Sequence, residues 1–159
     1  MPDPARAGPQ DPALAEFREF IETFGARHFK AEEFMVLGPS HAGSGPCVGK
    51  NSLPDKDLWE NVRPLVAALD AIRDEIGSGV FITNCYRNEA YNACVGGARS
   101  SQHKLFKAAD FVCRSGSSRA WANAAKVARS NGAFKGGIGL YSSFVHVDVR
   151  GTNADWDNS

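Results

Sequence analysis

The sequence predicts an α+β fold, because helical patterns come first along the chain and strand patterns cluster late. The chain has 159 residues, which is enough for one domain with a substantial core. Apolar residues recur at helical spacing before residue 77, and short strand-like runs bounded by turn residues follow. Helices followed by clustered strands favour an α+β arrangement over a doubly wound parallel sheet.

The domain is expected to begin with a helix near residue 12. Apolar residues recur at three- and four-residue spacing from Leu14 to Phe24, and Gly25 follows as a stop signal. Residues 1–11 contain three prolines and little apolar content. They are predicted to form a flexible N-terminal arm, which leaves residues 12–159 as a single domain.

A long loop and a second helix are expected next. Residues 38–56 are rich in Gly, Pro and Ser, and a loop of that length in a small domain is often functional. An amphipathic stripe then runs over residues 57–76, with Asp57 as the predicted N-cap. Pro64 inside this stripe either kinks the helix or marks its true first turn.

The rest of the chain is predicted to alternate short strands with short helices. Val, Ile, Phe and Tyr runs indicate the strands, and Gly and Asn end the helices. The expected strands cover residues 80–83, 108–113, 137–141 and 144–149, and the expected helices cover residues 88–95 and 117–130.

Charge and hydropathy exclude several function classes. Eighteen basic residues balance eighteen acidic ones, so the chain has no general attraction to nucleic acid or to an anionic membrane. No apolar run approaches the ~20 residues that span a bilayer, and no apolar stretch typical of a secretion signal follows Met1. Specific binding is therefore expected to depend on a local site.

The four cysteines predict no zinc knuckle, because none of them forms a C-x-x-C pair. Their burial preference favours free thiols over disulfides. Disulfides remain an alternative whose connectivity the sequence does not determine. The cysteines are Cys47, Cys85, Cys94 and Cys113.

Two histidines and two aspartates between residues 103 and 148 carry the main chemical signal. His103 precedes Asp110 by seven positions, and His146 shares a predicted strand face with Asp148. Two imidazoles and one carboxylate with an open fourth position form a typical catalytic zinc set. The same residues also fit a surface histidine and a hydrogen-bonded core histidine, so this pattern alone leaves both interpretations open.

Several motifs in the right order resemble the peptidase M15 family of zinc D-Ala-D-Ala carboxypeptidases and related cell-wall peptidases. Residues 101–110 match the family's S-x-H-x-x-G-x-A-x-D motif at Ser, His, Ala and Asp, and residues 144–148 resemble the strand with the last zinc histidine. Residues 86–87 resemble its Tyr-Arg element, and residues 91–98 resemble the segment before the first histidine. The resemblance covers about residues 28–150.

The resemblance implies a fold, a cofactor and an activity. The fold would be a small, mostly antiparallel sheet that carries the zinc site and packs against N-terminal and flanking helices, as in hedgehog and DD-peptidase domains. Zn²⁺ would be held by His103, Asp110 and His146. The activity would be hydrolysis of peptide bonds involving D-amino acids in peptidoglycan, by a carboxypeptidase or an endopeptidase.

Further site residues follow from the same resemblance. Arg87 would bind a substrate carboxylate or carbonyl oxygen and stabilise charge in the transition state. Ser101 and Tyr141 would contact the substrate, and Asp155 and Trp156 would close the rim of the site.

The general base is left open by the sequence. Some relatives carry an acid three residues before the last histidine, and that position is Ser143 here. Asp148 is the nearest carboxylate on the strand. It would act catalytically by deprotonating the attacking water, or it would hold a ligand histidine in one tautomer.

Phe106 is the clear departure from the family pattern. It stands where the family has a glycine, a residue that often serves positive φ or close backbone approach. We therefore expect Phe106 to use an ordinary backbone conformation, or the turn to differ.

Two readings compete with the peptidase. A non-haem iron oxygenase would use His146, Asp148 and a later histidine, but no histidine follows Asp148. A domain that holds zinc without catalysis and binds cell wall or a protein partner stays open, because of Phe106 and Ser143.

The expected partner is the peptidoglycan stem peptide, with no nucleic acid and no membrane insertion. The chain is expected to be a monomer, or to join a phage or tail assembly. It is expected to act at the cell wall or periplasm, reached by a route other than its own signal or after a leader is trimmed.

Overall fold

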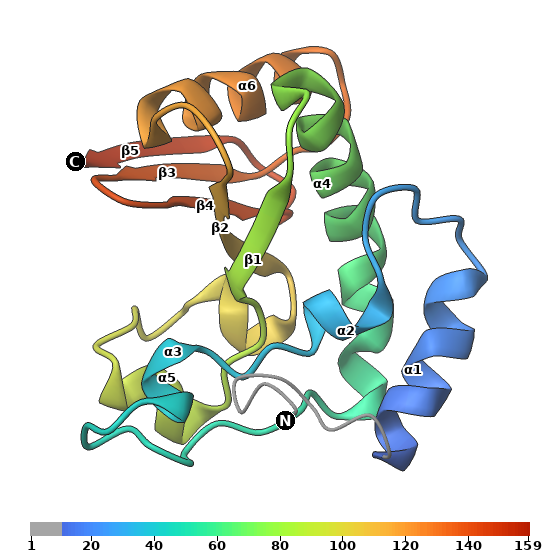
Figure 1. The fold of residues 1–159 in the computed structure, drawn as a ribbon, viewed down its shortest axis with the longest axis vertical. Coiled ribbons are helices and arrows are strands. Elements are labelled where there is room, and N and C mark those ends of the chain that lie inside the picture. Colours follow the sequence, from blue (N-terminus) through green and yellow to red (C-terminus); the bar gives the residue numbers. More distant parts are fainter. Residues whose placement is uncertain (1–10) are drawn as a thin grey trace.

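A five-stranded mixed sheet forms the centre of the domain in the computed structural model, which describes residues 11–159. Its order is β1-β2-β4-β3-β5 (Figure 1). β3 and β5 are parallel, and every other neighbouring pair is antiparallel. The strands are β1 (Val80–Asn84), β2 (Ala108–Cys113), β3 (Gly137–Tyr141), β4 (Val145–Asp148) and β5 (Ala154–Asn158). The predicted α+β class with a mostly antiparallel sheet is confirmed.

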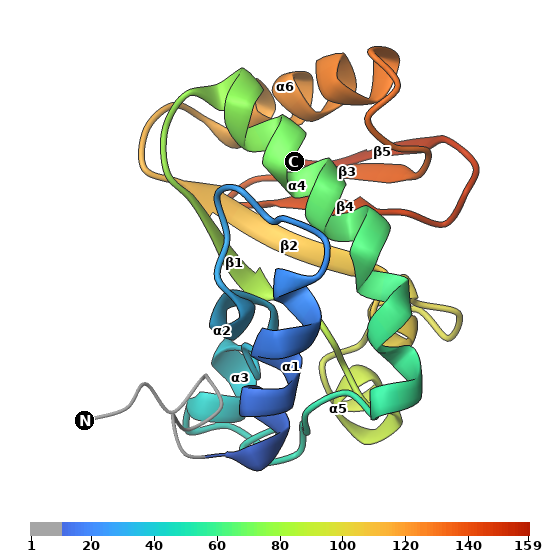
Figure 2. The ribbon, with the colours of Figure 1, turned by 90° about the vertical axis from the view of Figure 1, so that its right-hand side faces the viewer.

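Helices flank the sheet on one side and at one end (Figures 1 and 2). The long helix α4 and helix α6 pack on the sheet, and α1 lies beyond α4. None of the described helices is long and apolar enough to cross a membrane. The helices are α1 (Pro12–Glu22), α2 (Ala31–Phe34), α3 (Pro39–Ala42), α4 (Val62–Ile76), α5 (Glu89–Cys94) and α6 (Ser118–Ser130), with 3₁₀ turns η1 (Lys56–Asn61) and η2 (Gln102–Leu105).

The two faces of the sheet have different compositions, because side chains alternate along each strand. The helix-covered face is apolar and belongs to the core; it carries Ala109, Phe111, Ile138, Leu140, Val145 and Val147. The other face carries polar and small residues in matching register, because Asp110 pairs with His146, and Gly139 lies between His146 and Trp156. This second face is where chemistry can occur.

The start of the long helix differs from the prediction. Asp57 does not cap it, because residues 56–61 form the 3₁₀ turn η1 and α4 begins at Val62. Pro64 then falls in the first turn of α4. Backbone N–H groups in the first turn have no partner within the helix, so proline costs no helical hydrogen bond there. Of the two alternatives for Pro64, the first-turn interpretation is correct.

The N-terminal arm predicted for residues 1–11 lies almost wholly outside the described residues. The first described residue, Asp11, is the N-cap of α1, and its carboxylate accepts the Ala13 N–H at 2.9 Å. Gly25, with φ of 64°, follows the end of α1.

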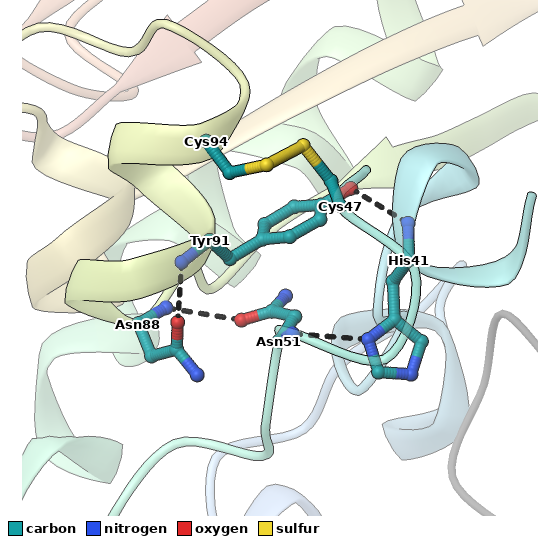
Figure 3. Close-up of a disulfide and its surroundings, with 6 residues drawn as sticks. All are labelled: His41, Cys47, Asn51, Asn88, Tyr91 and Cys94. Carbon is teal, nitrogen blue, oxygen red and sulfur yellow. Dashed lines mark hydrogen bonds between the residues drawn. A yellow bond between two sulfur atoms is a disulfide. The ribbon is translucent and has the colours of Figure 1, made fainter. Parts of the chain in front are cut away.

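A disulfide joins Cys47 to Cys94, so the expectation of free thiols is wrong for this pair. The expectation relied on the burial preference of cysteine. Two cysteines 47 positions apart meet only because the loop over residues 38–56 folds back on α5. Figure 3 shows the bond beside Tyr91, whose hydroxyl accepts the His41 N–H at 3.2 Å. Cys85 and Cys113 are free thiols, as expected.

The same loop is held by an asparagine whose side chain bonds to three backbone groups in two other segments. Asn51 donates to the carbonyls of Leu37 and Tyr86 at 3.0 and 2.9 Å, and its side-chain oxygen accepts the Asn88 N–H at 3.0 Å. The loop over residues 38–56 is therefore a packed part of the domain, and the disulfide links it covalently to α5.

Removing the disulfide should destabilise the protein markedly. A link that closes a loop of this length contributes about 4 kcal/mol, chiefly by restricting the unfolded chain. We expect Cys47→Ser with Cys94→Ser to lower the free energy of unfolding in urea by about that amount. Cys113→Ser, which removes a free thiol, is the control and should cost less than about 1 kcal/mol. Equal losses in both proteins would contradict a stabilising role for the bond.

Candidate metal centre and its cleft

Three buried side chains converge on one point of the polar sheet face. Asp110 and His146 are directly opposite each other on β2 and β4, and His103 comes from η2, just before β2. The Asp110 Oδ1 atom lies 3.2 Å from His103 Nε2 and 3.0 Å from His146 Nδ1. One ligand atom from each residue lies within 4.8 Å of the other two. The structure therefore brings together all three residues that the sequence named as metal ligands.

The turn that presents His103 is held by one side-chain bond and one backbone bond. The Ser101 hydroxyl accepts the His103 N–H at 3.3 Å, and the Lys107 N–H donates to the Gln102 carbonyl at 3.1 Å. The turn ends at Phe106, which has φ of 59° and lies in the left-handed region. The expectation of an ordinary backbone at Phe106 is wrong: the phenylalanine adopts the conformation that glycine would favour.

Packing of the Phe106 ring accounts for that backbone. The side chain is fully buried and makes edge-to-face contacts with Phe17 of α1 at 5.8 Å and with Tyr86 at 6.3 Å between ring centroids. Left-handed backbone costs a non-glycine residue about 1–2 kcal/mol, whereas burying a phenylalanine stabilises by about 1.5–3 kcal/mol. Burial therefore offsets the strain of a left-handed backbone at Phe106.

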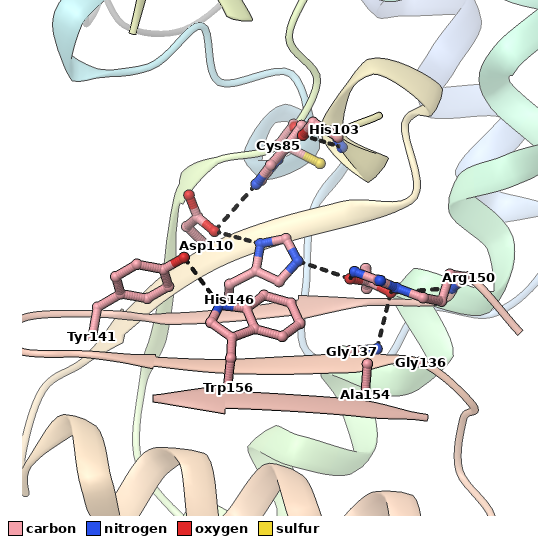
Figure 4. Close-up of polar contacts among 12 residues, drawn as sticks. Cys85, His103, Asp110, Gly136, Gly137, Tyr141, His146, Arg150, Ala154 and Trp156 are labelled. Carbon is pink, nitrogen blue, oxygen red and sulfur yellow. Dashed lines mark hydrogen bonds and ion pairs between the residues drawn. The ribbon is translucent and has the colours of Figure 1, made fainter. Parts of the chain in front are cut away.

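Each histidine is fixed in one tautomer by the nitrogen that points away from Asp110. The His103 Nδ1–H donates to the Cys85 carbonyl at 2.6 Å, since a carbonyl can only accept. The His146 Nε2–H donates to Asp148 Oδ2 at 2.9 Å. The nitrogen lone pairs of both rings then face the same oxygen of Asp110, as Figure 4 shows for the labelled residues.

The ionisation of these groups shows that the site favours a cation. Burial alone would raise the pKa of Asp110, but the neighbouring rings of His103 and His146 hold it below its ordinary value. Burial lowers the pKa of His103. For His146, burial also opposes the charged form, yet hydrogen bonds to Asp110 and Asp148 raise the pKa above its ordinary value.

The donor set fits a metal ion of the zinc type. Two neutral imidazole nitrogens and one carboxylate oxygen are the ligands of many catalytic zinc sites. Both outer ring nitrogens already have acceptors, which is the usual arrangement around a metal-bound histidine. His103, Asp110 and His146 are therefore the residues that would hold the ion.

Asp148 supports His146 and does not face the cleft. It is fully buried, and both of its oxygens are occupied. Oδ1 accepts the Gly137 N–H at 2.9 Å and the Arg150 Nε–H at 2.8 Å, and Oδ2 accepts from Arg150 Nη2 at 2.7 Å. Burial opposes the charged form, but Arg150 and His146 hold the pKa of Asp148 below its ordinary value. Of its two expected roles, the geometry favours holding the histidine over acting as a base.

Arg87 lies beside the metal residues. Its Nη2 donates to Asp110 Oδ2 at 3.3 Å, and its backbone N–H donates to the His103 carbonyl at 3.1 Å. The side chain is 15% exposed, and its buried Nε–H has no partner among the described residues. The guanidinium therefore pairs with the metal carboxylate and retains donor capacity for a further group.

A cleft of about 480 Å³ opens above these side chains. The expected substrate residues Ser101 and Tyr141 line it, and so do Phe144 and Trp156. Ser143 is exposed and does not line it. Asp155 turns away and pairs with Arg129 of α6 at 2.6 Å, so its expected place at the rim is wrong.

Sequence reasoning missed two contributors to the site. Arg150 follows Asp148 by two positions, and that spacing was the available signal for a shared face. The Cys85 carbonyl, which orients His103, left no signal, because any residue type offers a backbone carbonyl. Strand β5 was also missed, since Ala154–Asn158 is polar and carries a single large apolar residue.

Comparison with known proteins supports membership of one protein family. A model of the peptidase M15 family matches residues 27–148. The matched segment includes His103, Asp110, His146 and Asp148, and it ends before Arg150 and Trp156. No curated protein and no solved structure matches the chain.

The strained turn at Phe106 can be tested with two substitutions. Both Phe106→Ala and Phe106→Gly remove the buried ring, at about 3–5 kcal/mol. Only glycine also relieves the left-handed backbone, so we expect the glycine variant to be the more stable by about 1 kcal/mol in urea unfolding. An alanine variant as stable as the glycine variant would show that the turn carries no strain.

The role of Asp148 can be tested through metal affinity. In Asp148→Asn the charge-assisted bonds to His146 and Arg150 are lost while the shape is kept, and we expect a zinc affinity 10–100-fold weaker by competition with a chelating dye. Asp74→Asn is the control, because Asp74 is an exposed carboxylate that pairs with Arg27 outside the cleft. Unchanged affinity in Asp148→Asn would exclude a supporting role for this carboxylate.

Proposed function

Because the chain belongs to the peptidase M15 family of metallopeptidases, we propose that it is a zinc peptidase that hydrolyses peptide bonds involving D-amino acids in bacterial peptidoglycan. The observation that carries this proposal is the buried His103–Asp110–His146 cluster at the floor of an open cleft. The alternation of strand β4 puts the ligand His146 and its partner Asp148 on the same face of the sheet, where Asp148 lies buried behind the ring.

The residues around the metal cluster have different roles in the proposed hydrolysis. A bound zinc ion polarises a carbonyl oxygen and activates water at neutral pH. Arg87 supports the binding of a substrate carboxylate or carbonyl, because its guanidinium borders the cleft next to Asp110. Asp148 and Arg150 hold the His146 ring in place while the substrate binds.

The peptidoglycan stem peptide is the partner that we propose for this cleft. Such peptides carry free carboxylates, and the cleft is bordered by the guanidinium groups of Arg87 and Arg150. Ser101 and Tyr141 add neutral hydrogen-bonding groups to the lining. A carboxypeptidase would place a terminal carboxylate at Arg87, whereas an endopeptidase would leave that end of the cleft open to a longer peptide.

We propose further that the protein acts at the cell wall or in the periplasm, as a monomer or within a phage or tail assembly. The disulfide between Cys47 and Cys94 supports this place of action, since such bonds persist in oxidising compartments. The neutral charge balance is consistent with a partner that is neither nucleic acid nor membrane surface.

A second candidate is a zinc-holding domain that binds cell wall or a protein partner without cutting it. One observation favours it. The cleft contains no carboxylate apart from Asp110 among the described residues, since Asp148 is buried and position 143 is a serine. A peptidase on this scaffold would therefore use another acceptor for the proton of the attacking water.

The two candidates are separated by metal content and product analysis. Wild-type protein and His146→Ala would be analysed for bound metal and incubated with purified peptidoglycan, with released fragments identified by mass spectrometry. We expect about one zinc per chain and released fragments for the wild type, and neither for the variant. His28→Ala is the control, because this histidine pairs with Asp74 outside the cleft and should change nothing.

Each outcome of that experiment has a distinct meaning. Fragment masses would identify the bond that is cut. Bound zinc without fragments would favour the binding domain. Absence of zinc under metal-replete conditions, with circular dichroism showing a folded protein, would exclude both candidates.

A further inference from the structure

The Tyr141 hydroxyl accepts one hydrogen bond and has a hydrogen that it can donate. Tyr141 ends β3 on the polar sheet face and lines the cleft that contains the metal residues. Trp156 Nε1–H donates to the Tyr141 oxygen at 3.1 Å (Figure 4). Among residues 11–159, no group accepts the hydroxyl hydrogen of Tyr141. A phenol oxygen that accepts one hydrogen bond is thus left to donate another into the cleft.

Three contacts fix the position of this hydroxyl. The Tyr141 ring stacks on Phe144 with centroids 4.3 Å apart and planes 8° apart, and the Trp156 bond holds its outer end. The indole lies flat on the sheet because Gly139 has no side chain: a Cβ there would come within 2.3 Å of Trp156 Nε1. The hydroxyl is therefore held in place before any ligand arrives.

The indole also joins this hydroxyl to the metal cluster. The ring centroids of Trp156 and His146 are 5.2 Å apart, and both rings lie on the same sheet face as Tyr141, since Gly139 is in register with both residues. Trp156 lies outside the segment that matches the family. Strand β5 thus adds to the site a residue that lies outside the matched segment.

We propose that Tyr141 is a catalytic residue that donates its O–H to the oxygen of the scissile carbonyl as negative charge develops there, and that Trp156 is the positioning residue that directs it. This inference rests on the proposed hydrolysis and names one of its donors. The guanidinium of Arg87 already pairs with Asp110, whereas the Tyr141 hydrogen has no acceptor within the described part of the chain. A fixed, uncommitted donor is the kind of group that stabilises an oxyanion without reorganisation.

The proposed hydrogen bond from Tyr141 adds no reactant or product to the hydrolysis. The water oxygen bonds to the carbonyl carbon, the carbon–nitrogen bond breaks, and the water's proton goes to the departing amine. Tyr141 keeps its proton throughout, and no oxidant or reductant is needed. Tyrosine thus supplies charge stabilisation, which is a different role from accepting the proton of the attacking water.

The first test measures binding of a tetrahedral anion and does not depend on which peptide is the substrate. Methylphosphonate would be titrated calorimetrically into the zinc-loaded wild type, Tyr141→Phe and Trp156→Phe. One hydrogen bond to a charged oxygen is worth about a tenfold to hundredfold change in affinity. We expect that loss in Tyr141→Phe and a smaller loss in Trp156→Phe, which keeps an aromatic ring but no N–H. Zinc affinity should stay unchanged in both.

The second test measures peptidoglycan cleavage. We expect kcat to fall about 10²–10³-fold in Tyr141→Phe, the range for loss of one oxyanion donor, with little change in KM. Tyr86→Phe is the matched control, because its ring packs on Phe106 outside the cleft lining. Thermal unfolding of all variants would separate a lost donor from a lost fold.

The outcomes are distinguishable from failure of the proposed function. Equal methylphosphonate affinity in the wild type and Tyr141→Phe would overturn the inference, whatever the substrate, and so would a wild type that does not bind the anion. Wild-type cleavage with an undiminished kcat in Tyr141→Phe would overturn it while leaving the peptidase intact. Weaker anion binding in Tyr141→Phe without cleavage by the wild type would support the donor and count against the peptidase alone.

Discussion

The pairing of β2 with β4 places a buried carboxylate opposite a buried histidine, and the chemistry of the domain depends on that contact. Asp110 and His146 meet in register, and η2 brings His103 to the same oxygen. Two lone pairs facing one carboxylate are unfavourable in a buried setting unless a cation lies among them. The surrounding groups are arranged accordingly: the Cys85 carbonyl and Asp148 take the outer N–H groups, and Arg150 keeps Asp148 ionised. The site is therefore prepared for a metal before one binds.

The metal-binding turn is anchored to the core through a residue that breaks the family's pattern. Phe106 holds a left-handed backbone because its ring packs between Phe17 of α1 and Tyr86. The other wall of the cleft is anchored differently. Residues 95–98 follow directly after Cys94, which the disulfide ties to the loop at Cys47. Packing on one side and a covalent bond on the other thus limit the movement of the cleft walls, which suits a site whose ligands need fixed positions.

Much of the fold and of the metal cluster was predictable from the sequence because the signals were local. Strand β2 has the predicted bounds, since the run from Ala108 to Cys113 is apolar apart from Asp110 and Arg-Ser-Gly follows it. His103, Asp110 and His146 stood out because the short motifs around them resemble those of the peptidase M15 family, whereas the histidine and aspartate pattern alone left two interpretations open. Strand β5 was not predictable, because its residues are mostly polar and it pairs in parallel with a strand already placed in the sheet. The disulfide was missed because two cysteines 47 positions apart carry no local signal of proximity.

The sequence by itself determined which residue types were available for metal chemistry and on which elements they lie, because strand and turn periodicity depends on near neighbours. Only the tertiary structure decided what each residue does. Asp148 holds a ring because Arg150 and Gly137 occupy its oxygens, and Phe106 keeps a glycine's backbone because a distant helix buries its ring. Tyr141 presents its hydroxyl to the cleft because Trp156 arrives from another strand over Gly139. Such roles depend on contacts between segments far apart in the chain, and the pattern within any one segment does not encode them.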